Sequence, residues 1–232
     1  MNTDSRQTIH IGINFVFSPA PIIESQSNWQ FQKSLMECGI ECSRAELKDR
    51  GILIVRETPP RLEIRVGNLP NSPVGQLLVV SSDPRCELEL FIKDTEAVIE
   101  AFKATWKIAN RQIISNDVTI RDLYEATEEH AFKELWEKRL HQAPNSLARF
   151  GRPVLGGGLR FVMPPRQDDT DPVQIEVKIE SFLQDTKKIF LETQFVWLSS
   201  KSPGDSFDPN SRLKDVDQYI ERQVEAFVVG GD

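Results

Sequence analysis

Arginine side chains gather in one stretch of the sequence that contains no carboxylate. Between Glu137 and Asp168 lie 30 residues without an aspartate or a glutamate, and six of them are cations. These cations are Lys138, Arg139, Arg149, Arg152, Arg160 and Arg166. Because arginine forms planar, paired hydrogen bonds with phosphates and carboxylates, this segment is a candidate surface for an anionic partner. We expect the partner-binding residues to be Arg149, Arg152, Arg160 and Arg166.

Two explanations of this charge pattern are open. The arginines either pair with acids of the same chain, such as Glu128, Glu129, Asp168 and Asp169, or meet a separate anionic molecule. Exposed ion pairs contribute only about 0–1 kcal/mol each, so stability alone gives little reason to gather arginines here. The net charge of the chain is −7, which disfavours a nucleic acid without excluding it. We therefore expect a protein as the partner.

Residue patterns of known catalytic and metal sites do not occur in the sequence. His10, His130 and His141 do not form the His-Glu-x-x-His pattern of zinc proteases, and the three cysteines lack the paired spacing of a zinc site. The glycines at 156–158 lack the Lys-Ser/Thr pair that completes a phosphate-binding loop. We predict no catalytic residue, no metal and no cofactor. Whether the chain is an enzyme stays open, and a non-enzyme is favoured.

Alternating side chains predict a strand at the start of the chain. Isoleucine and phenylalanine occupy every second position from Ile9 to Phe17, as in a strand with one buried face. Ser27 and Gln30 form a capping-box pattern that predicts a helix, and Gly39 predicts its end. An antiparallel meander is expected next, with strands at 41–48, 51–57, 62–66, 76–81 and 87–92. A helix capped by Asp94 completes this half.

The second half repeats this order of elements. A strand at 111–117 leads to Thr119, which we expect to cap a long helix from Asp122 to about His141. That helix would carry His130 and His141. Strands are expected at 154–163, 173–180 and 188–198, followed by a closing helix that begins at Asp208-Pro209 and ends at Gly230.

These elements predict an α+β fold of two tandem β-α-(antiparallel β meander)-α units that together form a pseudo-symmetric molecule. The first unit spans 1–109 and the second 110–232, with one continuous domain as the alternative. Helices on one face of each sheet would leave the other face polar and form a groove or saddle. The charge is uneven between the halves, because residues 1–116 carry a net charge of −1 and residues 117–232 a net charge of −6.

Composition limits the compartment and the class of protein. With three cysteines, an odd number, no disulfide framework is expected, and no stretch reaches the roughly 18 apolar residues that cross a bilayer. We expect a cytoplasmic protein with no membrane partner, whose oligomeric state the sequence leaves open. The leading hypothesis is a non-catalytic binding or assembly protein that engages a protein partner. The alternative is a binder of a small apolar or nucleotide-like ligand, held in a cavity lined by Trp136, Phe161 and Phe195.

Overall fold

The computed structural model describes residues 1–48, 51–70, 72–82, 87–106, 111–168, 170–198 and 207–230. Nine antiparallel strands form one sheet in the order β2-β3-β4-β5-β1-β6-β9-β8-β7, which confirms a mixed α+β fold. The strands are β1 (Asn2–Ser18), β2 (Arg44–Lys48), β3 (Gly51–Arg56), β4 (Leu62–Asn68), β5 (Gly75–Ser82), β6 (Gln112–Glu125), β7 (Gly158–Met163), β8 (Val173–Ser181) and β9 (Lys188–Trp197).

The two longest strands, β1 and β6, lie at the centre of the sheet and join the two halves of the chain. Their register places Ile11 beside Ile120 and Ile13 beside Val118, and all four side chains are buried. The alternation that predicted the first strand therefore also sets which face of the sheet is covered, because successive side chains point to opposite faces. Asn110, the predicted boundary between the halves, lies outside the described residues.

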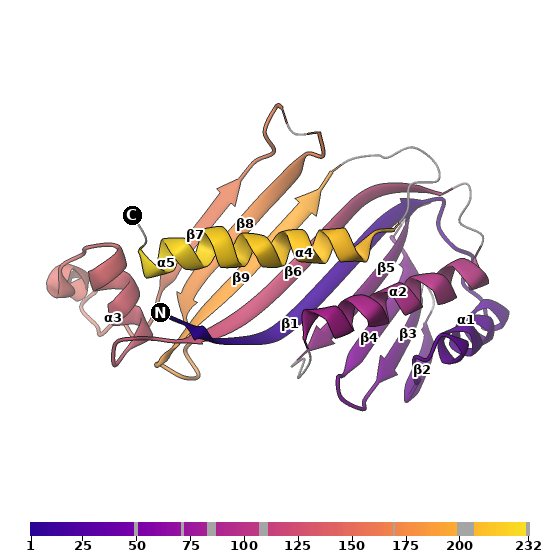
Figure 1. The fold of residues 1–232 in the computed structure, drawn as a ribbon, viewed down its shortest axis with the longest axis horizontal. Coiled ribbons are helices and arrows are strands. Elements are labelled where there is room, and N and C mark those ends of the chain that lie inside the picture. The colour runs from indigo at the N-terminus through magenta and orange to yellow at the C-terminus, as the bar shows by residue number, and fades with distance from the viewer. Residues whose placement is uncertain are drawn as a thin grey trace.

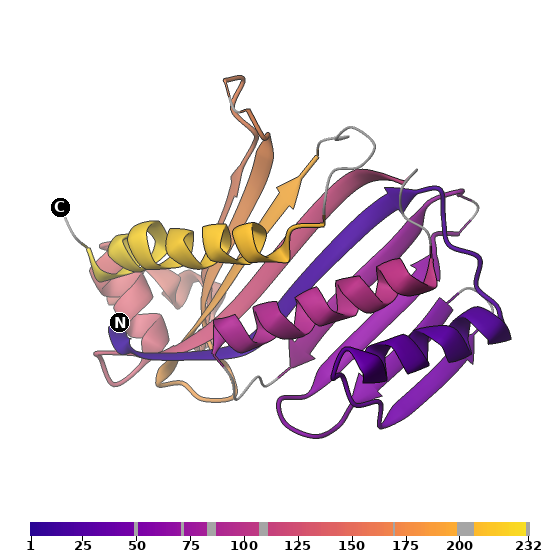
Figure 2. The ribbon, with the colours of Figure 1, turned by 45° about the vertical axis from the view of Figure 1, so that its right-hand side comes forward.

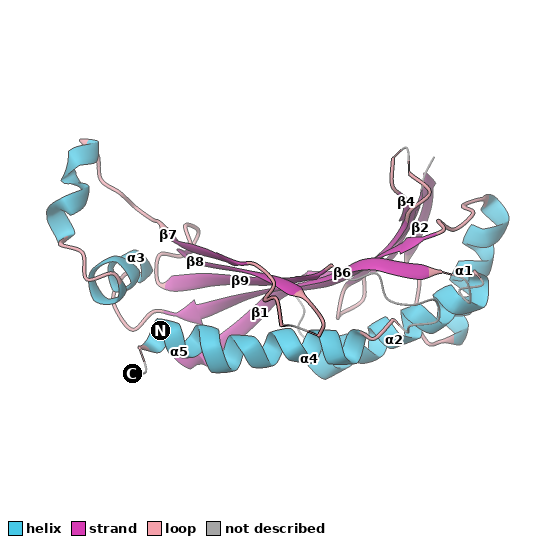
Figure 3. Cartoon of the chain, turned by 90° about the horizontal axis from the view of Figure 1, so that it is seen from above, coloured by secondary structure: helices cyan, strands magenta, loops and turns pink. Residues whose placement is uncertain are grey.

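Helices from both halves of the chain lie on one face of the sheet and leave the other face open (Figures 1 and 3). They are α1 (Ser25–Glu37), α2 (Leu88–Thr105), α4 (Pro209–Tyr219), the π-helix η3 (Ile220–Val224) and α5 (Glu225–Val229). Beyond one end of the sheet lie α3 (Ala131–Lys133), the π-helix η1 (Glu134–Arg139) and the 3-10 helix η2 (Pro144–Phe150). Figure 2 shows α1 and α2 side by side over the first half of the sheet. In Figure 3 both ends of the sheet bend away from the helices, so the open face is concave.

A cluster of aromatic rings fills the space between the sheet and the helices. The ring of Phe207 lies 4.8 Å from that of Phe15 and 5.9 Å from those of Phe17 and Phe102. Phe102 on α2 also packs on Trp106, at 5.1 Å between ring centroids. These rings belong to β1, α2 and the start of the last helical row, so burial of their surface joins both halves into one core.

Two predicted elements of the first half are wrong. Residues 87–92 do not form a strand, because α2 begins at Leu88, and Asp94 lies inside this helix instead of capping it. The buried helical positions Phe91, Thr95 and Val98 show that the helix starts about two turns earlier than predicted. The predicted capping box is also shifted, since Glu24 is the N-cap of α1 and its backbone N–H donates to Ser27 Oγ. The predicted turn at Asp83-Pro84, together with Cys86, lies outside the described residues.

The long helix predicted from Asp122 to His141 is also wrong. Strand β6 continues to Glu125, and Asp122 and Tyr124 are buried on its helix-covered face. The four-residue spacing from Leu123 to Leu135 is coincidental, because only the part after Ala131 is helical. The closing helix is confirmed, with the Asp208 side chain accepting a hydrogen bond from Ser211 N and Pro209 in the first turn.

Candidate functional site

The segment that contains the predicted arginines leaves the sheet as an arm, which we define as residues 126–157. It carries α3, η1 and η2 and lies beyond one end of β7 and β8 (Figure 1). Its base is tied to the turn between β8 and β9, because Ala126 N donates to Lys187 O and Ala131 N donates to Thr186 O, both at 2.8 Å. The arm therefore has a fixed base and an exposed tip.

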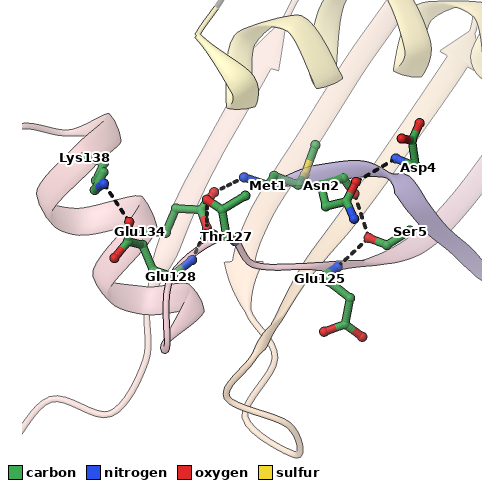
Figure 4. Close-up of polar contacts among 9 residues, drawn as sticks. All are labelled: Met1, Asn2, Asp4, Ser5, Glu125, Thr127, Glu128, Glu134 and Lys138. Carbon is green, nitrogen blue, oxygen red and sulfur yellow. Dashed lines mark hydrogen bonds and ion pairs between the residues drawn. The ribbon is translucent and has the colours of Figure 1, made fainter.

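A buried carboxylate holds the base of the arm. Glu134 on η1 accepts hydrogen bonds from the backbone N–H and hydroxyl of Thr127, from Glu128 N and from the amino group of Met1 (Figure 4). Burial opposes ionisation of this carboxyl, but the hydrogen bonds from Met1 and Thr127 outweigh burial and hold the pKa of Glu134 below its ordinary value. This charged network fixes where the rest of the arm lies.

The arm folds back on itself around an open hollow of about 740 Å³. Its floor is apolar, with Phe132, Trp136, Leu147 and Val154, and its rim carries cationic side chains. The lining residues at the rim include His130, Lys133, Glu137 and Arg152. The indole Nε1 of Trp136 is buried and has no acceptor among the residues that the structure describes. An apolar floor below a mainly cationic rim suits an anionic group attached to an apolar one.

The six cations of the predicted segment divide into two groups. Lys138 pairs with Glu128 at 2.6 Å, and Arg160 forms two hydrogen bonds of 2.9 Å with Glu176. Arg139 packs against Gly230 at the end of α5, and Arg166 also interacts within the chain. Arg149 and Arg152 are exposed and form no ion pair or hydrogen bond within the described part of the chain. The explanation by internal pairing thus holds for Lys138 and Arg160 and fails for Arg149 and Arg152.

The three residues of the predicted cavity, Trp136, Phe161 and Phe195, lie in different parts of the structure. Trp136 lines the hollow of the arm, whereas Phe161 lines a separate groove beside β7. Phe195 is buried on β9, where its ring packs on Trp197 and Tyr219 at 5.5 and 5.1 Å. Trp136 lies apart from Phe195 because it belongs to η1 of the arm, whereas the sequence predicted a long helix above the sheet at this position.

The groove beside β7 was not predicted from the sequence. It has a volume of about 460 Å³ and lies between β7 and β8 on one side and η3 and α5 on the other. Its lining is apolar apart from Arg160 and Gln223, and includes Phe161, Met163, Val177, Tyr219 and Phe227. The sequence contained one sign of this groove. Phe227 of the closing helix is apolar but only half-buried, and its ring lies against Phe161 of the edge strand β7.

A buried ionic cluster under the last helical row was also missed. The guanidinium of Arg6 lies 3.2 Å from Asp122 Oδ1 and 2.8 Å from Asp217 Oδ1 on α4. Thr8 Oγ1 donates to Asp122 at 2.6 Å, and Tyr124 OH donates to Glu225 at 2.8 Å. Burial raises the pKa of Asp122, although Arg6 and Thr8 act in the opposite direction. These contacts tie β1 and β6 to the last helical row, while Asp122 Oδ2 is buried without a hydrogen-bond partner among the described residues.

Histidine and acidic side chains do not assemble a metal site in the part of the chain that the structure describes. No group of three or more His, Cys, Asp or Glu side chains there could hold an ion. His130 caps α3 by accepting a hydrogen bond from Phe132 N at Nδ1, and His141 is exposed beyond η1.

None of the described helices is both long enough and apolar enough to cross a bilayer.

Comparison with known proteins adds no relationship to this description. No family model matches the sequence, and no curated protein is significantly similar to it.

Proposed function

We propose that this chain is a non-catalytic binding or assembly protein that engages a protein partner through the arm. The observation that carries the proposal is the state of Arg149 and Arg152, which are exposed and unpaired within the described residues. Both belong to a half of the chain with a net charge of −6, where partners for them are plentiful. Guanidinium groups held apart from these acids are available to a carboxylate of another molecule.

Exposed apolar side chains beside these arginines favour a protein as the partner. Phe150 directly follows Arg149 and is 73% exposed, and Leu155 is 70% exposed. Arginine and aromatic residues are the side chains most enriched among the anchors of protein interfaces. A nucleic acid fits less well, because two unpaired arginines in a chain of net charge −7 neutralise few phosphates. The arm thus combines an anion-binding part with an apolar part.

The location in the cytoplasm is part of the same proposal. Cys38 and Cys42 are free thiols, as is usual for proteins of reducing compartments.

Two variants test the proposed role. R149A/R152A removes the unpaired cations, whereas R65A removes an exposed cation of β4, in the other half of the sheet, that already has a carboxylate partner in Glu63. Proteins captured from a lysate of the native organism are quantified by mass spectrometry for the wild type and both variants. We expect R149A/R152A to lower capture of at least one protein about tenfold, in a salt-dependent manner, because each charged hydrogen bond contributes about 1.5–3 kcal/mol.

The matched variant R65A is expected to leave that capture within about twofold, because Arg65 lies on β4, away from the arm and from β7. Thermal unfolding of R149A/R152A should match the wild type, because neither side chain contacts the folded core. Equal capture profiles for the wild type and R149A/R152A would show that the arm is not the contact surface.

We also propose that residues 1–109 and 110–232 form two like units. The strand order supports this idea, because β1 is followed outward by β5, β4 and β3, and β6 is followed outward by β9, β8 and β7. Each half then ends in a helix over the same face of the sheet, α2 in the first and α4 in the second. Superposition of the two halves of an experimental structure tests the proposal, which fails if β3, β4 and β5 do not overlay β7, β8 and β9.

A further inference from the structure

The two outer strands of the sheet differ in how they are protected. Strand β2, at one edge, carries Arg44, Glu46 and Lys48 in five residues, and charged side chains on an edge strand oppose pairing with another chain. Strand β7, at the other edge, has a single charged residue, Arg160, and exposes Phe161 and Val162. No further strand pairs with β7 among the described residues. An edge of this kind is a template for a strand from another molecule.

Hydrogen bonding between β7 and β8 leaves alternate backbone groups of β7 facing outward. Ser181 N donates to Gly157 O at 3.0 Å, and the register pairs Leu159 with Ile179 and Phe161 with Val177. Because hydrogen-bonded and non-hydrogen-bonded positions alternate in an antiparallel ladder, Leu159 and Phe161 bond to β8. The N–H and C=O groups of Gly158, Arg160 and Val162 then point to the outer edge.

The apolar groove beside β7 would receive half of the side chains of an added strand. Phe161 and Phe227 line it with their rings 5.4 Å apart, and Phe227 is 50% exposed. Successive side chains of a strand point to opposite faces, so an added strand would place every second side chain beside Phe161. Those side chains should be apolar, whereas the others would lie on the concave face near Arg160.

A second hollow lies next along β7, between the start of the strand and the arm. This hollow of about 280 Å³ is lined by Gly158 and Leu159 of β7 together with Trp136, Leu147 and Val154 of the arm. Trp136, Leu147 and Val154 also line the larger hollow, whose rim carries Lys133 and Arg152. A segment that runs along β7 towards Gly158 therefore arrives at the cationic rim.

We infer that the arm's protein partner supplies an extended segment that pairs with the outer edge of β7 as a tenth strand. Its residues are apolar at alternate positions over the groove, and it is acidic at the end that reaches Arg149 and Arg152. This inference rests on the proposed function, since it specifies the part of the partner that binds.

Charge complementarity favours such a segment over a second copy of the same chain. Residues 138–167, which include β7, contain no carboxylate, so a second copy paired edge to edge would bring its own arginines to this region. It would offer Arg149 and Arg152 no acid from its own β7. An acidic segment of a different protein satisfies both the free strand edge and the cations.

Peptide selection on the intact protein tests the inference. Random 12-residue peptides displayed on phage are selected against the immobilised chain, and the binders are then titrated by fluorescence anisotropy. We expect the selected peptides to be rich in Asp or Glu at one end and to have apolar residues at every second position in the rest of the sequence. Peptides without acidic residues, or no binders at all, would overturn the inference.

Val162→Pro removes one outward N–H of β7 without touching the ladder to β8, because proline is tolerated where the N–H of an edge strand faces outward. Its matched control, Val162→Thr, keeps the N–H and the branched shape. We expect V162P to weaken peptide binding about tenfold, the cost of about one lost hydrogen bond, and V162T to bind within about twofold of the wild type. Equal affinities of V162P and V162T contradict strand addition.

Hydrogen exchange gives a second measurement that requires no variant. The amides of Arg160 and Val162 should exchange more slowly when the selected peptide is bound, and unchanged exchange at both would overturn the inference. So would a dimer of the free chain that V162P dissociates in sedimentation, since β7 would then pair with its own copy. If R149A/R152A lowers capture of the partner but V162P does not, the proposed function stands and strand addition fails.

Discussion

The two halves of the sheet are covered to different extents. Strands β3, β4 and β5 lie under two helices, α1 and α2, which pack side by side (Figure 2). Strands β7, β8 and β9 lie beside a single helical row, made of α4, η3 and α5 (Figure 1). The segment that follows β6 forms the arm, which lies beyond the end of the sheet (Figure 1). The apolar groove beside β7 lies in this less covered half.

Local sequence explains why the two segments behave differently. Residues 25–37 contain neither proline nor glycine and form one helix of 13 residues, whose Phe31 and Leu35 are fully buried. The arm contains Pro144, Gly151 and Pro153, which interrupt helical structure. The first helical stretch of the arm covers only nine residues, 131–139, six of which form a π-helix, and the second is the seven-residue 3-10 helix η2. The half of the sheet that is covered by one helical row is thus also the half that has an apolar groove and an apolar edge strand.

The strongest test of this comparison replaces one phenylalanine in each half. The Phe102 ring is fully buried on Phe17, Trp106 and Phe207, so F102A should lower the free energy of unfolding by about 3–5 kcal/mol. The matched change F227A, at a half-exposed position, should lower it by less than about 1 kcal/mol. Urea unfolding monitored by circular dichroism measures both. Similar losses would mean that the groove belongs to the core and is not a free surface.

A second test concerns the buried ionic cluster under the last helical row, which contains Arg6, Asp122 and Asp217. R6A leaves Asp122 buried without its cation and should lower the free energy of unfolding by about 3 kcal/mol at neutral pH. The control R65A removes an exposed cation of β4 that pairs with Glu63, and should change stability by less than about 1 kcal/mol. Urea unfolding of both variants at pH 7 gives the comparison.

The double variant R6M/D122N distinguishes a lost ion pair from a lost contact. It removes both charges and should be more stable than R6A, because no unpaired buried charge remains.

The pH dependence of R6A adds a further check. Burial raises the folded-state pKa of Asp122, so its charged form costs stability at neutral pH, and the deficit of R6A should shrink as the pH falls towards about 3.9, the ordinary carboxyl value. A deficit that grows on acidification would assign the loss to another residue.

Much of the sheet could be predicted from the sequence, because alternation is a local property of each strand. Strands β8 and β9 occupy the predicted residues to within a few positions, and Asp208-Pro209 starts the last helix as expected. The strand β6 was cut short at 117 because Thr119 and Asp122 resemble a helix cap. Asp122 is instead a strand residue whose charge is satisfied by Arg6, more than a hundred positions away, a contact that no local pattern reports.

The candidate site could be predicted only in part for the same reason. The lack of carboxylates singled out the segment that forms part of the arm and β7, but the pairing of Arg160 with Glu176 depends on the register between β7 and β8. Trp136 was expected above the sheet because a continuous helix was expected to carry it. The edge position of β7 and the groove beside it follow from strand order, which the sequence does not encode locally.

The smallest expected effect on stability concerns His10, which lies on the open face of the sheet where β1 pairs with β6. His10 on β1 folds over Gly12 and faces Arg121 on β6, with Glu192 on β9 beyond it. Burial and the Arg121 cation lower the pKa of His10 to about 4, from 6.5, and Glu192 opposes this only weakly. The unfolded chain therefore binds a proton at this residue before the folded chain does, and stability is lost as the pH falls from about 6.5 to about 4.

Replacement of His10 by glutamine should remove this part of the acid sensitivity. Because the imidazole is only partly buried, we expect the difference in unfolding free energy between pH 7 and pH 4.5 to shrink by about 1–2 kcal/mol in H10Q. His141→Asn, a change at an exposed histidine of the arm, serves as the matched control and should leave that difference as in the wild type. Urea unfolding at both pH values measures the effect. Equal pH dependence in H10Q and the wild type would mean that carboxyl groups, and not the imidazole of His10, set the loss of stability in acid.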